Sequence, residues 1–147
     1  ADELVVFCAP GHPLAKQASA TLAELADESW IVREPGSGTR ETLDQALRHQ
    51  HSPLKVRLEL EHTEAIKRAV EFGLGIGCIS RLALREAFRR GSLVAIQTPE
   101  LDLQRHFHFL WHRRKFQTAG MREFIGLCRA MTAGVERSDQ IEWSFIP

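Results

Sequence analysis

The chain has 147 residues, of which 44% are apolar and 26% are charged, and its 19 basic side chains equal its 19 acidic ones. These values are typical of one globular domain or two small lobes, and they exclude a disordered tail, a collagen-like repeat and a coiled coil. No apolar run approaches the roughly 18–20 residues that a membrane helix needs, so we expect no contact with a membrane. The zero net charge excludes an overall basic footprint for nucleic acid.

The first half of the chain alternates between short apolar runs and capped helices. Residues 4–9 form an apolar run that predicts a buried strand. Thr21 and Glu24 have the spacing of a capping box and predict a short helix. Residues 29–32 predict a second strand, and the Pro-Gly-Ser-Gly-Thr turn at residues 35–39 opens a second helix.

The pattern continues through the middle of the chain. Residues 54–60 alternate with period 2, which predicts a strand with one solvent-exposed face. Thr63 is expected to cap the helix that follows, and Gly73 to supply the left-handed residue at its end. Residues 75–80 predict another strand, and Gly91 ends the helix after it.

The carboxyl-terminal part predicts strands at residues 92–96 and 105–112, a helix at residues 118–131 with Thr118 as its cap, and a short strand at 143–147. From residue 29 to residue 97 the predicted order is strand, helix, strand, helix, strand, helix, strand. That order implies an α/β fold with a mostly parallel, open sheet flanked by helices on both faces.

Some predicted elements do not complete a lobe of their own. Two strands and one helix, at residues 1–9, 105–112 and 118–131, cannot cover each other's apolar faces. Either they pack on the main lobe, or part of a second lobe is missing from this chain. We therefore expect exposed apolar surface at residues 1–8 and 118–131, or self-association that covers it.

The segment with the most chemical information links the strand at 29–32 to the next helix. In an open α/β sheet, ligands bind beyond the carboxyl ends of the strands, where the first amides of a helix lack partners and carry partial positive charge. We expect a small anion there, such as a phosphate, a sulfur oxyanion or a carboxylate. The candidate ligands are Gly36, Ser37, Gly38, Thr39, Arg40 and Thr63. The alternative is plain helix capping, with Arg40 paired to a surface carboxylate.

Other motifs give weak signals. The glycines at residues 73–77 lie between a helix and a strand, whereas a dinucleotide fingerprint lies between a strand and a helix. No P-loop or nucleophile elbow occurs, so we expect neither an enzyme nor a cofactor. His106 and His108 have zinc-ligand spacing, but no carboxylate or thiolate is near them in sequence, which disfavours a metal site. The three widely spaced cysteines favour buried thiols in a reducing compartment.

Taken together, these pieces resemble the effector-binding domain of a LysR-type transcriptional regulator. The resemblance extends from Asp2 to about Met131. The matching segments are Asp2 to Ala15, Trp30 to Glu34 with Gly36 to Arg40, Glu64 to Lys67 with Gly73 to Ile76, and Gly91 to Leu93.

The resemblance implies a type 2 periplasmic-binding-protein-like fold, here with one complete lobe plus part of a second. Residues 10–95 would form lobe II, and residues 1–9 with 96–147 would form part of lobe I. It also implies a cytoplasmic sensor that binds a small-molecule effector between its lobes and forms dimers, or tetramers at full length. Promoter DNA would bind only through an absent amino-terminal winged helix-turn-helix. The edge strand and helix at 54–60 and 63–73 would contact a partner subunit. The alternative is a solute-binding protein of a transport system, which has the same fold.

Overall fold

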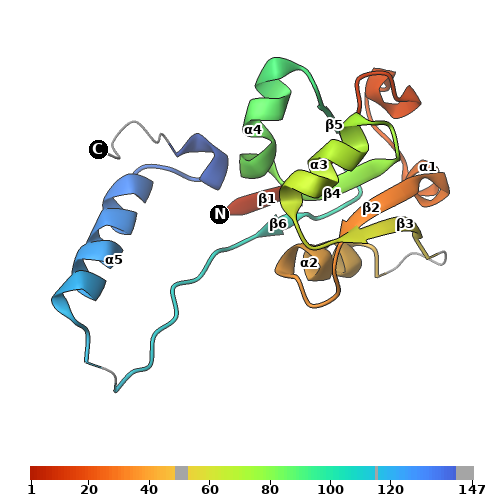
Figure 1. The fold of residues 1–147 in the computed structure, drawn as a ribbon. Coiled ribbons are helices and arrows are strands. Elements are labelled where there is room, and N and C mark those ends of the chain that lie inside the picture. The colour runs from red at the N-terminus through yellow and green to blue at the C-terminus, as the bar shows by residue number, and fades with distance from the viewer. Residues whose placement is uncertain (49–52, 115, 142–147) are drawn as a thin grey trace.

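The computed structural model describes residues 1–48, 53–114 and 116–141. Its centre is a sheet with strand order β3-β2-β4-β1-β5, and a short strand β6 pairs with the start of β1 (Figure 1). The strands are β1 (Asp2–Cys8), β2 (Ser29–Arg33), β3 (Lys55–Leu60), β4 (Ile76–Ser80), β5 (Val94–Ile96) and β6 (Gln104–Arg105).

Strand β1 alone runs against the others. It is antiparallel to β4, β5 and β6, whereas β2 is parallel to β3 and β4. The predicted α/β fold with a mostly parallel sheet is confirmed. The central position of β1 buries Leu4 to Cys8 to 5% exposure or less, so the expected exposure of these residues is wrong. A continuous apolar run fits this position because a central strand is covered on both faces.

Helices cover both faces of the sheet, in keeping with right-handed crossovers. The first face carries α1 (Leu22–Asp27) and α2 (Gly38–Ala46), and the second carries α3 (Thr63–Glu71) and α4 (Arg81–Arg90). Because successive side chains of a strand point to opposite faces, β1 contributes to both cores. Leu4 and Val6 pack under α1 and α2, whereas Val5 and Phe7 pack under α3 and α4.

Most predicted helix boundaries are confirmed. The Thr21 hydroxyl accepts from the Glu24 amide, and the Glu24 carboxylate accepts from the Thr21 amide, which completes the capping box. Gly73 adopts the predicted left-handed conformation, with φ of 74°. Helix α4 ends at Gly91 as predicted, and Gly91 has φ of 71°. The expected cap at Thr63 is wrong: His62 is the N-cap residue, without a side-chain cap bond, and Thr63 is the first helical residue.

The carboxyl-terminal part departs most from the expectation. Helix α5 (Ala119–Thr132) is confirmed, and Thr118 caps it by accepting from the Met121 amide at 3.2 Å. The strand predicted at 105–112 is wrong beyond Arg105, because residues 106–112 pair with no strand among the described residues. The strand predicted at 143–147 lies outside the described residues.

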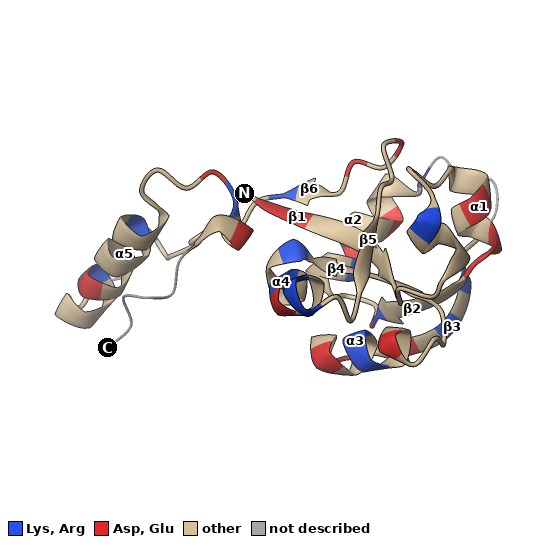
Figure 2. Ribbon diagram, turned by 90° about the horizontal axis from the view of Figure 1, so that it is seen from above, with Lys and Arg blue, Asp and Glu red and all other residues tan. Residues whose placement is uncertain are grey.

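Helix α5 lies apart from the sheet and its helices (Figures 1 and 2). None of its residues is buried, and Phe124 and Leu127 are 59% and 56% exposed. The apolar exposure expected for residues 118–131 is therefore confirmed. A short helix η2 (Ser138–Gln140) then brings the chain back to β1 and α4.

Two further features of the fold bear on its organisation. Strand β3 lies at the edge of the sheet, and its Val56 side chain is 38% exposed. The expected contact of this edge with a partner subunit stays a prediction. Within the described ranges, no helix is both long enough and apolar enough to cross a membrane. The division into lobes at residues 9/10 and 95/96 stays a prediction, since β1 shares its sheet with β2 to β5.

Candidate functional site

The predicted anion site lies where β2 ends and α2 begins. The Ser37 amide donates to the Glu34 carbonyl at 3.2 Å, which closes a turn with Pro35 and Gly36 at its centre. Gly36 has φ of 87°, the value that the third position of a type II turn requires, so a glycine is favoured there. The Ser37 hydroxyl then caps α2 by accepting from the Arg40 amide at 3.1 Å. The amides of the first two helical residues have no intrahelical acceptor and point toward this corner.

Arg40 already has protein partners in this structure. Its Nε lies 3.0 and 3.1 Å from the two carboxylate oxygens of Asp44, and its Nη1 donates to the Arg33 carbonyl at 3.0 Å. Glu59 on β3 lies 3.8 Å from the same Nη1. These contacts tie the end of β2 to α2 and β3. The contact of Arg40 with an anion stays a prediction. In this structure its guanidinium contacts the carboxylates of Asp44 and Glu59, as the alternative interpretation expects.

Thr39 is 9% exposed and meets a cation from a distant part of the chain. The Arg105 guanidinium donates through Nη1 to the Thr39 hydroxyl at 3.2 Å. A Cβ placed on Gly38 would lie 4.0 Å from the same Nη1, so Arg105 lies directly against the start of α2. The amino end of a helix is partially positive, so it disfavours a cation there unless negative charge compensates.

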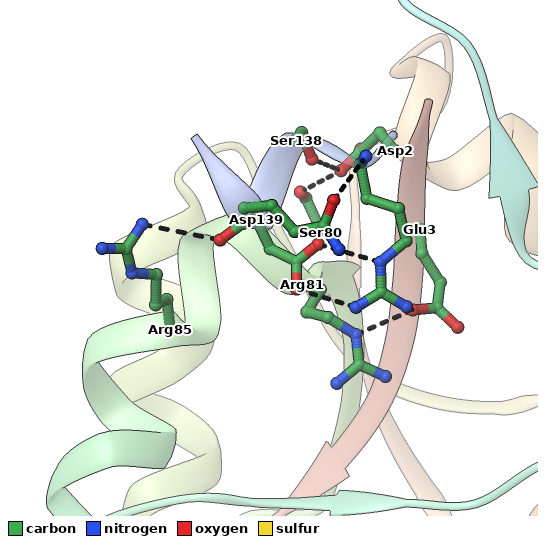
Figure 3. A network of polar contacts seen from close by, with 9 residues as sticks. Asp2, Glu3, Ser80, Arg81, Arg85, Ser138 and Asp139 are labelled. Atoms are coloured by element: carbon green, nitrogen blue, oxygen red, sulfur yellow. Dashed lines mark hydrogen bonds and ion pairs between the residues drawn. The ribbon is translucent and has the colours of Figure 1, made fainter. Parts of the chain in front are cut away.

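The compensating charge is the buried carboxylate of Asp2, at the start of β1. It accepts from Arg105 Nε at 2.7 Å. It also accepts from the Ser80 hydroxyl at 2.7 Å and from the Ser138 hydroxyl at 2.6 Å (Figure 3). Burial alone would raise the pKa of Asp2, but the hydrogen bonds from Ser138, Ser80 and Arg105 together lower it below the ordinary value of 3.8. Asp2 is therefore ionised at neutral pH.

Thr63 begins a helix at the same edge of the sheet but on its other face. It follows β3, whose end is in register with the end of β2, where Arg33 pairs with Leu60. Helix α2 packs on one face of the sheet and α3 on the other. A single anion held by both Thr39 and Thr63 stays a prediction.

A cavity of about 300 Å³ lies between β1 and residues 96–104. Glu3 and Arg81 line it and form an ion pair at 2.7 Å. None of the six predicted ligands lines this cavity. The cavity and the corner at Thr39 are therefore separate features.

Metal binding finds no support in the part of the chain that is described. No group of three or more His, Cys, Asp or Glu side chains there could hold a metal ion. The rings of His106 and His108 are 6.3 Å apart and tilted by 40°.

The sequence matches the family model described as LysR substrate binding domain over residues 1–133. The chain belongs to this family. The match covers β1, the α2 corner, β6 and Arg105, and all of α5. The resemblance suggested by the sequence is confirmed, and so is the fold that it implied.

The curated relatives of this LysR domain are transcriptional regulators. The HTH-type transcriptional regulator YeiE of Escherichia coli K12 is 42% identical over 127 residues, which cover 86% of this chain and 43% of that protein. The transcriptional activator CmpR of Synechocystis is 34% identical, over 78% of this chain and 38% of CmpR. This LysR domain thus spans less than half the length of either relative.

Solved structures show the same fold. The CcmR regulatory domain of Synechocystis, determined in complex with 2-PG, superposes with a TM-score of 0.76 at 29% identity. The aligned part covers 91% of this chain and 64% of CcmR. The effector-binding domain of QuiR, in complex with shikimate, has a TM-score of 0.66 at 23% identity, which supports the fold alone.

Sequence reasoning missed Asp2 and Arg105 as members of this LysR domain's candidate site. They are 103 residues apart in the chain and meet because β6 pairs with the start of β1. The signal that could have found them is the direction of β1 in the sheet. A strand that runs against its neighbours brings its first residue to the edge where the others end.

Proposed function

We propose that this chain is the effector-sensing part of a LysR-type transcriptional regulator, and that its effector is a small anion. The family match over residues 1–133 carries the sensor function. We propose an anion because two positive groups, the Arg105 guanidinium and the amino end of α2, meet at Thr39. The relatives named above are transcriptional regulators, which favours a sensor over a transport protein.

The anion would occupy the corner at the start of α2. Gly36 and Gly38 leave the backbone open, Thr39 offers a hydroxyl, and Arg105 offers a charged fork of N–H donors. Arg40 would hold the corner in place through its bonds to Asp44 and to the Arg33 carbonyl at the end of β2, rather than act as the main ligand of the anion. The 2-PG complex of the CcmR domain supports a small ligand in this fold.

The remaining functions belong to the whole regulator. We propose that it acts in the cytoplasm, that its subunits form dimers or tetramers, and that an amino-terminal helix-turn-helix outside this chain binds promoter DNA. The names of the relatives support the DNA-binding part. The exposed edge at β3 supports association between subunits. No catalytic step enters this function.

Binding by the full-length gene product tests the anion site. Titration calorimetry with 2-PG, inorganic phosphate and sulfate would identify a binding anion, which is then measured again with Thr39→Val. Loss of one hydrogen bond to a charged group costs about 1.5–3 kcal/mol, so affinity should fall roughly tenfold or more.

Thr42→Val is the matched control for this substitution. Thr42 lies on the same helix, and its hydroxyl donates to the Gly38 carbonyl at 2.8 Å. It should leave the affinity within about twofold. Equal affinity in the wild type and Thr39→Val would remove the corner from the candidate sites.

A further inference from the structure

The segment that contains α5 is attached on both sides to one carboxylate. Before the helix, Arg105 in β6 donates to Asp2 at 2.7 Å, and after it, Ser138 in η2 donates to the other oxygen of Asp2 at 2.6 Å. The Asp2 side chain is completely buried. Helix α5 itself has no buried residue.

The attachment after α5 is reinforced around η2. The Ser138 amide donates to the Ala1 carbonyl at 2.8 Å, and Arg85 on α4 donates to the Ile141 carbonyl at 2.8 Å. Glu3, the residue after Asp2, lies 3.6 Å from Arg137. Figure 3 shows Asp2, Ser80 and Ser138 meeting where η2 approaches the start of β1. The chain after α5 is therefore bound to the same two residues of β1 that pair with β6.

The same Arg105 that binds Asp2 also reaches the predicted anion corner. Its Nε donates to Asp2 and its Nη1 donates to Thr39, so one guanidinium bridges the start of β1 and the start of α2. Its carbon also lies 5.1 Å from the centre of the Phe107 ring, on the segment that leads to α5. A guanidinium has five N–H donors, so it can contact an anion while keeping both of these bonds.

We propose that Asp2 is a positioning residue that couples an anion at the amino end of α2 to the segment containing α5 and η2. The proposal rests on the anion site proposed above. An anion there offsets the repulsion between Arg105 and the positive end of α2, and so favours the arrangement in which Arg105 bridges Thr39 and Asp2. A ligand stabilises the conformation that it binds, so the attachment of β6 and η2 at Asp2 tightens. By reciprocity, loss of that attachment weakens anion binding.

Replacement of Asp2 separates this coupling from simple electrostatics. Removing a negative charge close to an anion site would by itself tighten anion binding. The coupling predicts the opposite for Asp2→Asn: the affinity of the full-length gene product for the anion that binds best falls at least about fivefold. Ser138→Ala, which leaves every charge in place, should weaken binding in the same direction.

Glu86→Gln is the control. It removes a carboxylate from α4, one that pairs with Arg89 of the same helix rather than with β6 or η2. Its affinity should stay equal to the wild type or rise slightly. Hydrogen exchange adds a readout in the wild type, where the anion should slow the exchange of residues 119–140.

Each outcome has one meaning. Weaker binding by Asp2→Asn and Ser138→Ala, with unchanged binding by Glu86→Gln, supports the coupling. Unchanged or tighter binding by Asp2→Asn overturns the coupling but leaves the anion site in place. Binding that is lost in Thr39→Val but gives no protection at 119–140 in the wild type also overturns the coupling alone. If no anion of the panel binds the wild type, the site and the coupling both fall.

Discussion

Replacing Gly77 by alanine tests how tightly the core under α3 is packed. Gly77 lies in β4 and pairs with Phe7 of β1. An added Cβ would lie 2.7 and 2.8 Å from two atoms of the Phe7 ring and 3.2 Å from a methyl group of Val70. Both neighbours are fully buried, so the ring cannot swing out toward solvent. The strand or the helix must move instead.

We expect Gly77→Ala to lower the free energy of unfolding by about 1–3 kcal/mol, the usual cost of overpacking. Relative to glycine, alanine recovers some backbone entropy, roughly 0.5–1 kcal/mol, so the strain itself is larger than the net effect. Urea unfolding, followed by the fluorescence of buried Trp30, measures the change.

The exposed helix α5 provides the control. A Cβ on Gly126 would meet nothing within 4 Å, so Gly126→Ala should be neutral or stabilising by about 0.5–1 kcal/mol. The cost of Gly77→Ala should shrink in a Phe7→Leu background, where the ring is gone. An equal cost in both backgrounds would refute the assignment of the strain to Phe7.

Three further predictions concern capping, acid and thiols. Thr21→Ala should lower the free energy of unfolding by about 1 kcal/mol in urea, because α1 loses its capping box. The folded-state pKa of Asp2 is lowered from 3.8, so its contribution to stability is present above that value and is lost as pH falls below it; acid titration of Asp2→Asn should show a shallower decline than the wild type. Burial raises the pKa of Cys8 to about 11 and of Cys78 to about 12, whereas Cys128 is partly exposed. Iodoacetamide at pH 8 should therefore label Cys128 first, and faster labelling of Cys78 in the folded protein would contradict its burial.

The elements that the sequence predicted are those whose signals are local. The capping box at Thr21 and the glycines at residues 73 and 91 act within one helical turn, and each is found where it was expected. The run at residues 4–9 also predicted a strand correctly. Its place in the centre of the sheet depends on β4 and β5, which follow about 70 residues or more later, so no local pattern specified it.

The errors arise where a local pattern needs a distant partner. Residues 106–112 alternate like a strand, but a strand forms only where another edge accepts its hydrogen bonds, and here β6 ends at Arg105. The anion contact predicted for Arg40 is a different case, because it stays a prediction. In the structure, Asp44 lies one turn further along α2 and meets its guanidinium. Spacing alone could not choose between these two uses of the same side chain.

The reversed direction of β1 explains how one strand serves both the core and the site. Its residues 4–8 are fixed between β4 and β5, or between β4 and the chain before β6, and are buried on both faces. Its first two residues extend past that region to the edge where β2 and β4 end, and there they pair with β6. A carboxylate at this edge would by itself repel an anion, and its pairing with Arg105 removes that penalty while leaving the positive end of α2 available. Because residues 4–8 are tightly packed, we expect a change at Asp2 to act on its hydrogen-bond partners, which are Ser80 at the end of β4, Arg105 in β6 and Ser138 in η2. The proposed coupling between the α2 corner and the segment that contains α5 therefore depends on the direction of a single strand.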